Sequence, residues 1–328
     1  MELPHALRTA IEEELAALPP ATVARLSEGL SARYRGEERR GQSLLTGPGD
    51  AAAYAVTRLP ATHGAIGAAL AAAGDALPDW SPATVLDVGA GPGTAAWAAV
   101  GRWPGVRQVT HLEREPAMIA LGQRLEQRAA APWQAHWLTA DATGPWEVPP
   151  HDLTLCCYML GEVAVDKRAA LVERLWQVTG GMLVLVEPGT PAGFAVVRAA
   201  RAQLLALGAA MAAPCPGPVP CPMEGGNWCH FSQRVARTRL HRQAKGGELA
   251  YEDEKYSYVA FSRLPAQPTP ARVLRHPLVR KGHLRLTLCT PRGEENATVT
   301  RSQGERYRAA KDLRWGDGFE WEETPKQD

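Results

Sequence analysis

The stretch Val85-Leu-Asp-Val-Gly-Ala-Gly-Pro-Gly-Thr94 decides the fold of this chain. An apolar run carries Asp87 near its end, three glycines follow at alternate positions, and an apolar helical pattern comes next. Glycines permit a tight turn and let a ligand approach the backbone closely, and the first turn of a helix offers unpaired N–H groups. Because no Gly-Lys-Ser/Thr follows, the loop is not a phosphate-gripping P-loop. The stretch therefore predicts a strand, a ligand-binding turn and a helix.

The surrounding sequence alternates between short apolar runs and helical patterns, which is typical of a parallel α/β sheet. Ahead of it, helical patterns reach Arg35 and then cover residues 51–76, with a break at Pro60. Beyond it, Pro214–Pro222 is too rich in proline for a helix or a strand. The strands that we expect are Thr84–Val88, Val109–Glu113, His136–Ala140, Leu153–Cys157, Met182–Glu187, Tyr256–Phe261 and Leu284–Cys289.

These patterns predict a doubly wound α/β sheet with an extension at each end. We expect a helical N-terminal extension (1–80), an α/β domain (81–213), a basic cysteine-bearing module (214–317) and an acidic tail (318–328). The residues from Trp315 onward are expected to fray. No apolar run approaches the roughly 18 residues of a membrane span, so we expect no association with membranes. We also expect a monomer.

Two further acids end the next two predicted strands. Glu113 lies 20 residues after Gly93, where an acid accepts hydrogen bonds from ribose hydroxyls, and Asp141 lies within reach of an adenine edge. This order resembles the class I S-adenosylmethionine-dependent methyltransferases over roughly residues 80–190. The resemblance implies that the glycine loop passes under the methionine part of the cofactor, that Glu113 holds the ribose and that Asp141 with Ala142 flanks the adenine. The cofactor-binding residues that it implies are Asp87, Gly89, Ala90, Gly91, Gly93, Glu113, Asp141 and Ala142.

Other interpretations of the loop stay open. A dinucleotide dehydrogenase would prefer Gly-x-Gly-x-x-Gly, and a glycine turn can also exist without a ligand. A binding fold does not prove catalysis, and no general base can be singled out. Cys156 or Cys157 would need an electropositive neighbourhood to act as a thiolate, so we interpret both as buried strand residues. Glu162 and Glu187 follow strands and are expected to line the pocket.

Four other cysteines form a second candidate site. Cys215, Cys221, Cys229 and Cys289 lack the paired C-x2-4-C spacing of a zinc ribbon. Their spacing favours metal binding over packing, and thiolate ligands favour zinc or an iron–sulfur cluster over hard cations. His230 is a fallback ligand.

Several segments together resemble the mitochondrial small-ribosomal-subunit methyltransferase-like family of assembly factors and its bacterial relatives. The resemblance implies a four-cysteine 4Fe-4S cluster on the four cysteines named above and a role at the small ribosomal subunit. Glu12, Glu13 and Glu14 are unlike a transit peptide, so we expect a bacterial, cytoplasmic member. The segments that carry the resemblance are Ala53–Thr62, Asp87–Gly93, Pro214–Pro222, Asn227–Phe231, Lys255–Ser262, Leu288–Pro291 and Ala309–Asp317.

The net charge of +1 conceals a local asymmetry. An apolar content of 45% and a charged content of 22% are ordinary for a globular protein and exclude a disordered or coiled-coil chain. Residues 231–314 hold 18 basic and 8 acidic residues, a net of +10, whereas residues 315–328 carry a net of −4. Arg234, Arg237, Arg239 and Arg242 recur at roughly helical spacing and are expected to share one face. The alternative is a solvated charged face. The RNA-binding residues that we expect are Arg234, Arg237, Arg280, Lys281, Arg285, Arg308 and Lys311.

Taken together, the residues and the resemblance predict an S-adenosylmethionine-binding, iron–sulfur-containing assembly factor that contacts small-subunit rRNA. Methylation of that rRNA is its candidate activity. One alternative is an active methyltransferase on a small molecule with a structural zinc site. Another is a purely structural protein that has lost cofactor binding.

Overall fold

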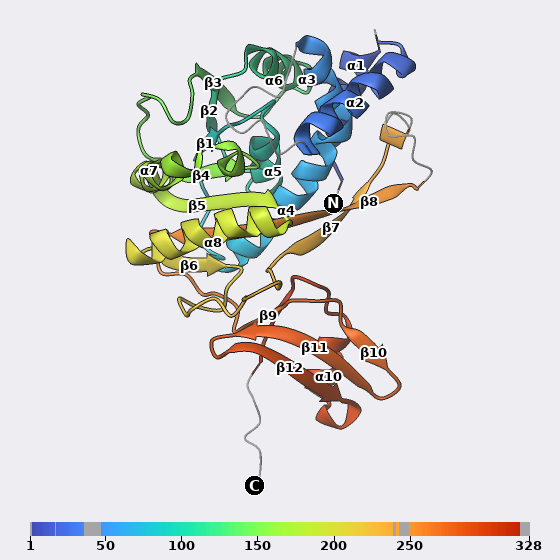
Figure 1. The fold of residues 1–328 in the computed structure, drawn as a ribbon, viewed down its shortest axis with the longest axis vertical. Helices are drawn as coiled ribbons and strands as arrows, with labels where there is room; N and C mark the ends of the chain where they lie inside the picture. Colours follow the sequence, from blue (N-terminus) through green and yellow to red (C-terminus); the bar gives the residue numbers. More distant parts are fainter. Residues whose placement is uncertain (1, 17, 36–46, 239–240, 243–248, 322–328) are drawn as a thin grey trace.

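A computed structural model describes residues 2–16, 18–35, 47–238, 241–242 and 249–321 of the chain, and its largest element is an eight-stranded sheet (Figure 1). The strand order is β3-β2-β1-β4-β5-β8-β6, and β7 also pairs with β8. Strands β1 to β5 run parallel to one another, whereas β8 is antiparallel to β5, β6 and β7. The strands are β1 (Thr84–Val88), β2 (Gln108–Glu113), β3 (Gln134–Thr139), β4 (His151–Cys157), β5 (Thr179–Pro188), β6 (Ala210–Ala213), β7 (Phe231–Ala236) and β8 (Tyr251–Ser262).

Helices cover both faces of this sheet, so the central strands are buried on both sides. Successive residues of a strand point to opposite faces: Val85 packs with α4, α5 and α6, whereas Leu86 packs with α7 and α8. The doubly wound arrangement predicted from the sequence is therefore confirmed. The helices are α1 (His5–Leu15), α2 (Pro20–Arg35), α3 (Pro48–Thr57), α4 (Leu59–Asp75), α5 (Thr94–Arg102), α6 (Pro116–Arg128), α7 (Val165–Gln177) and α8 (Pro191–Ala206).

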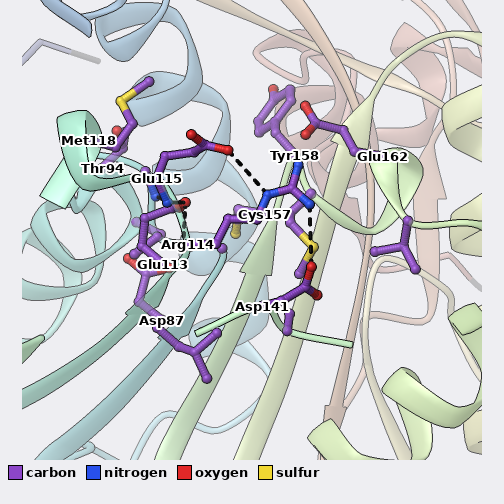
Figure 2. A pocket seen from close by; sticks show the side chains of 18 of the residues that line it. Asp87, Thr94, Glu113, Arg114, Glu115, Met118, Asp141, Cys157, Tyr158 and Glu162 are labelled. Atoms are coloured by element: carbon purple, nitrogen blue, oxygen red, sulfur yellow. Dashed lines mark hydrogen bonds and ion pairs between the residues drawn. The ribbon is translucent and has the colours of Figure 1, made fainter. Parts of the chain in front are cut away.

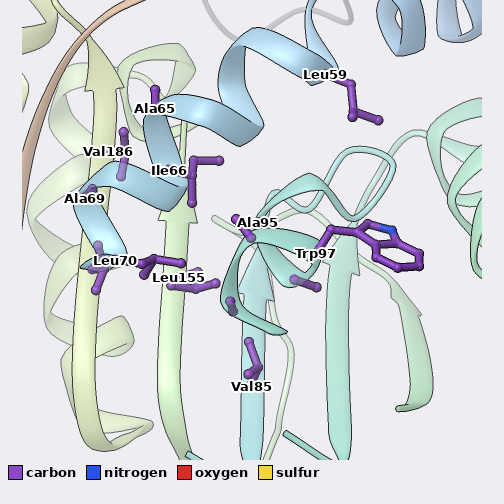
Figure 3. Packing of buried hydrophobic residues seen from close by; sticks show 14 of the residues in the cluster. Leu59, Ala65, Ile66, Ala69, Leu70, Val85, Ala95, Trp97, Leu155 and Val186 are labelled. Carbon is purple, nitrogen blue, oxygen red and sulfur yellow. The ribbon is translucent and has the colours of Figure 1, made fainter. Parts of the chain in front are cut away.

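The N-terminal helices are part of the α/β layer structure. Helix α4 lies against the sheet, and Figure 3 shows Ile66 and Leu70 directed toward Leu155 and its neighbours. Its alanines and glycines permit this close approach, since a Cβ on Gly64 would lie 2.6 Å from Val235 of β7. The expected break in this helical stretch falls at Arg58, and Pro60 lies in the first turn of α4, where proline is tolerated.

A second, five-stranded sheet follows, with the order β10-β11-β9-β13 and β12 pairing with β11. It has its own core, to which helix α10 (Glu305–Lys311) contributes Ala310. Figure 1 shows this unit beside the end of the first sheet. Its strands are β9 (Ala271–Val273), β10 (Leu278–Arg280), β11 (His283–Thr290), β12 (Gly293–Thr300) and β13 (Gly318–Phe319).

Three details differ from the sequence-based expectations. After the proline-rich loop the chain returns to the first sheet, because Tyr256–Ser262 is buried and fits between β5 and β6. The two sheets are therefore separated after residue 262 and not at residue 213. The helical face expected for Arg234 and Arg237 is wrong, since Arg234 lies in the strand Phe231–Ala236 and Arg237 follows that strand outside any helix. Arg239 lies outside the described residues.

The fraying expected from Trp315 onward is also wrong for the first residues of that segment. Trp315 packs its ring edge-on against His230 and His276, and Phe319 pairs with Ala271. The expected tail beyond residue 321 lies outside the described residues. In the part of the chain that the structure describes, no helix combines the length and the apolar character needed to cross a bilayer.

Candidate functional site

The glycine loop forms the turn that the sequence predicts. Gly89, Gly91 and Gly93 all have positive φ angles, of 69°, 54° and 81°, which favour glycine. A Cβ on Gly89 would also overlap the side chain of Met159. The Gly89 N–H donates to the Leu112 carbonyl at 2.8 Å, which fixes the loop against β2.

A cavity of about 220 Å³ opens above this loop, at the carboxyl ends of β1, β2 and β4 (Figure 2). The structure brings seven of the eight expected cofactor residues into its lining. Gly93 is the exception, because it lies at the start of α5 and packs on His111. The seven are Asp87, Gly89, Ala90, Gly91, Glu113, Asp141 and Ala142.

Glu113 accepts three backbone hydrogen bonds and so connects two backbone segments of the site. Its Oε2 accepts from the Gly91 N–H at 2.8 Å, and its Oε1 accepts from the N–H groups of Arg114 and Glu115 at 2.8 and 2.9 Å. Burial raises the pKa of this carboxyl, while the three N–H donors act in the opposite direction. One lone pair of Oε2 accepts from the Gly91 N–H of the loop, and a second lone pair is available to a ligand.

Asp141 lies on the opposite side of the cavity and is more exposed. Its Oδ1 accepts from the backbone N–H and the hydroxyl of Thr143, and these bonds lower its pKa. Figure 2 shows Arg114 between Glu115 and Asp141. Its Nε lies 3.3 Å from a Glu115 oxygen, and its Nη1 lies 3.5 Å from an Asp141 oxygen. The sequence analysis missed Arg114, although it directly follows Glu113.

The remaining wall comes from α3, α4 and the segment after β4. Tyr54 and Thr62 line the cavity, so the N-terminal extension is part of the site. Tyr158 takes a positive φ of 58° and its hydroxyl donates to Glu254 at 3.4 Å, while Arg58 lies 3.3 Å from the same carboxylate. The sequence analysis singled out none of these as site residues.

The two glutamates expected near the pocket have different positions. Glu162 lines the cavity, and burial raises its pKa to about 7. Glu187 lies behind the wall, where its Oε1 accepts from the Gly161 N–H at 3.0 Å. Burial raises the pKa of Glu187 to about 8.

The strand position predicted for Cys156 and Cys157 is confirmed, but only Cys156 is buried. Cys156 is fully buried and Cys157 borders the cavity. Burial, and then the nearby charges of Asp87 and Glu187, raise the pKa of both thiols well above the usual value. Both are therefore neutral thiols and poor nucleophiles at neutral pH.

The other four cysteines line one second cavity, between α8, the proline-rich loop, β8 and β11. Cys289 is buried and the other three are half-buried. Burial raises the pKa of Cys229 well above its usual value, and the neighbouring Cys215, Cys289 and Cys221 raise it further. Within the described ranges, no three His, Cys, Asp or Glu side chains are arranged as a ready metal site. His230 does not line the cavity, because its ring stacks on Trp228.

Buried arginines hold the proline-rich loop, which carries Cys215 and Cys221. Arg201 donates from Nε to the Cys215 sulfur at 3.3 Å and from Nη2 to the Val219 carbonyl at 2.6 Å. Arg272 donates to the Pro214 carbonyl at 2.9 Å. The sequence analysis missed these arginines, since they lie on α8 and β9 and are brought to the loop only by the fold.

Comparison with known proteins identifies the family. The family described as mitochondrial small ribosomal subunit Rsm22 matches residues 48–320. The chain belongs to the Rsm22 family. The predicted resemblance is thereby confirmed.

Two curated relatives give the extent of the similarity. The human mitochondrial ribosome assembly protein METTL17 is 29% identical over an alignment of 298 residues, and the alignment covers 84% of this chain and 64% of the human protein. The mitochondrial Rsm22-cox11 tandem protein 2 of Schizosaccharomyces pombe is 26% identical and aligns with 72% of this chain and 38% of its own length. The chain thus spans less than two thirds of either relative.

Solved methyltransferases are distantly similar in structure to this chain. Magnesium protoporphyrin IX methyltransferase from Synechocystis PCC 6803, solved with S-adenosylmethionine, is 15% identical, with a TM-score of 0.42 over 76% of this chain and 99% of its own. A likeness this distant says nothing about substrate, and the fold of this Rsm22 member is defined by its own strand order.

The basic residues expected to bind RNA do not form one surface in this Rsm22 member. Arg234 of β7 pairs with Asp253 of β8 at 2.8 Å, and Arg237, just after β7, pairs with Glu252 of β8 at 2.8 Å. The other five lie on the second-sheet unit, all exposed, and none belongs to an ion pair found among the described residues. They are Arg280, Lys281, Arg285, Arg308 and Lys311.

These five residues are divided between two sides of the second sheet. Leu284 and Leu286 of β11 point into the core together with Ala310 of α10, so Arg285 points to the opposite face. Arg280 shares the face of Arg285, because Leu278, two residues before it, pairs directly with Arg285. Arg308 and Lys311 lie on α10, on the other side.

We predict that Glu187→Gln stabilises the protein at alkaline pH. The folded pKa of about 8 lies above the ordinary value of 4.5, so the wild-type free energy of unfolding falls as the pH rises between these values. The loss is at most about 1.4 kcal/mol per pH unit. The glutamine keeps an acceptor for the Gly161 N–H and stays neutral, so the variant should exceed wild type at pH 8 and match it near pH 5. Urea unfolding at both pH values measures this, with exposed Glu147→Gln as the control. If the free energies of unfolding of Glu187→Gln and wild type differ by the same amount at both pH values, the prediction is wrong.

Proposed function

We propose that this protein binds S-adenosylmethionine in the cavity above the glycine loop and acts in assembly of the small ribosomal subunit. The observation that carries the cofactor proposal is the convergence of Asp87, Glu113 and Asp141 with the glycine loop in one cavity. A ribose can share the Glu113 Oε2, and the turn at Gly91 leaves space for close approach, since a Cβ there would meet no atom within 4 Å. The ribosomal part rests on family membership and on the human relative, a ribosome assembly protein.

The activity proposed for this site is methylation of small-subunit rRNA. The methyl group would leave the sulfonium for a nucleophilic atom of the acceptor, the sulfur would keep the bonding electrons, and the acceptor proton would pass to a base. Glu162 supports this proposal, because a carboxyl with a pKa of about 7 at the cavity wall is suited to accept a proton near neutral pH.

We further propose that Cys215, Cys221, Cys229 and Cys289 hold a 4Fe-4S cluster, with zinc as the alternative. Their common cavity and thiolate-only composition support this proposal. Arg201 would offset the negative charge of bound thiolates through its contact with Cys215. A bound cluster would cross-link the proline-rich loop to β11 and so stabilise both.

The RNA contacts that we propose are those of the basic residues on the second-sheet unit that have no acidic partner among the described residues. Arg280 and Arg285 lie together on one exposed face, where they can neutralise phosphates. Arg234 and Arg237 are expected to contribute less, since each already neutralises an acidic partner.

The cofactor proposal predicts that S-adenosylmethionine binds to the wild-type protein in calorimetric titration and binds Glu113→Gln at least about tenfold more weakly. The amide directs an N–H group either at the Gly91 N–H or at those of Arg114 and Glu115. Glu147→Gln, outside the cavity, is the matched control and should bind as wild type. Absence of binding heat at millimolar cofactor would rule out the cofactor and favour a purely structural protein.

The cluster proposal predicts that anaerobically purified protein is brown, with a broad visible absorption band and about four iron atoms per chain. Serine at any of the four cysteines should abolish the band and lower the thermal midpoint. Cys157→Ser, in the cofactor wall, should keep the band. A colourless protein that carries stoichiometric zinc would contradict the cluster proposal and support the zinc site instead.

The RNA proposal predicts that Arg280→Gln combined with Arg285→Gln weakens binding to small-subunit rRNA. The slope of log affinity against log salt should become shallower by roughly 0.7–0.9 for each phosphate that the variant no longer neutralises. Arg292→Gln is the control, because Arg292 pairs with Glu295 at 2.9 Å. Undetectable binding of wild-type protein at low salt would favour a methyltransferase for small molecules.

A further inference from the structure

A buried histidine lies directly below the cofactor cavity. His111, on β2, has no exposed surface and does not line the cavity. Its Nε2 lies 2.9 Å from Glu126 Oε1, and its Nδ1 lies 3.6 Å from Asp87 Oδ2. Neither His111 Nδ1 nor Asp87 Oδ2 has a hydrogen-bond partner elsewhere among the described residues. Each of these two atoms therefore has the other as its polar partner.

The surroundings of His111 favour its protonated form. A carboxylate faces each ring nitrogen, so both nitrogens are suited to carry a proton. Burial alone would lower the pKa of His111, but Asp87 and Glu126 outweigh it and raise the pKa. Glu126 also accepts from the indole N–H groups of Trp133 and Trp137, at 3.1 and 2.9 Å. Two carboxylates around one imidazolium would carry a net charge of −1.

The ring of His111 is held in place from several sides. It stacks on Trp137, with the ring centroids 4.1 Å apart. Trp137 cannot move toward α6, because even a Cβ on Gly122 would come within 2.5 Å of it. On the cavity side, a Cβ on Gly93 would lie 3.2 Å from His111 Cε1. His111 is therefore the rigid floor of the glycine loop.

Of the three charged residues His111, Asp87 and Glu126, only Asp87 lines the cavity. One of its oxygens faces His111, and a ligand cation beside the carboxylate would complete a group with no net charge. The α-ammonium group of S-adenosylmethionine is such a cation, and the adenosine part carries none.

We propose that His111 is a positioning residue of the cofactor site, which holds the Asp87 carboxylate in place for the ammonium group of the ligand. The proposal rests on the proposed function and extends it. It predicts that His111 governs affinity for the amino-acid half of the cofactor and leaves affinity for the adenosine half unchanged.

The test compares two ligands that differ in that half. S-adenosylhomocysteine carries the ammonium group, and 5′-methylthioadenosine lacks the amino-acid part. In His111→Gln the amide can replace Nε2 toward Glu126, but no donor remains toward Asp87. We expect affinity for S-adenosylhomocysteine to fall about tenfold or more in calorimetric titration, with affinity for 5′-methylthioadenosine unchanged within about twofold.

Two further variants keep the test independent of simple destabilisation. His111→Asn places an amide near the position of Nδ1, toward Asp87, and should recover part of the affinity ratio. Trp137→Phe removes a donor to Glu126 without touching Asp87, so it should lower the thermal midpoint and leave the ratio unchanged. An equal loss for both ligands in His111→Gln would overturn the positioning role. Failure of wild-type protein to bind either ligand would instead overturn the cofactor proposal, and the inference with it.

Discussion

The carboxylate of Glu113 holds the site together. Its two oxygens accept hydrogen bonds from backbone N–H groups of the glycine loop and of the turn that precedes α6. Neither segment has regular backbone hydrogen bonding at these positions, so their donors need another acceptor. Because Glu113 ends β2, next to β1, the parallel pairing of these strands fixes where that acceptor lies. The cavity, the position of Arg114 and the start of α5 all follow from this arrangement.

Strand β8 connects the two candidate sites. Glu254 accepts from Tyr158 in the wall of the cofactor cavity, and three residues later Ser257 donates to the Cys229 carbonyl at 2.8 Å. The same strand pairs with β5, β6 and β7. The two cavities are thus supported by one rigid element, and the proline-rich loop is an insertion within the first sheet.

The sequence predicted what depends on local pattern. Glycines at alternate positions, apolar runs and strand-terminal acids each have a direct physical reason, and β1 to β5 and seven of the eight expected cofactor residues lie accordingly. Patterns that depend on distant partners were less informative. Arg234 suggested a helix because its partner Asp253, on β8, cannot be known before the pairing is known. His111 and Arg201 gave no signal, since a buried polar group is recognised only from the neighbours that satisfy it.

The position of β8 also affects how the chain can fold during synthesis. β5 is the last parallel strand, and its partner on the outer side is β8, which ends at Ser262. β6 pairs with no strand except β8 among those described. When residue 213 has been made, β5 still presents an apolar open edge, and an open edge of this kind invites pairing with other chains. Co-translational folding of the first sheet can therefore finish only after the whole proline-rich loop and β8 have left the ribosome.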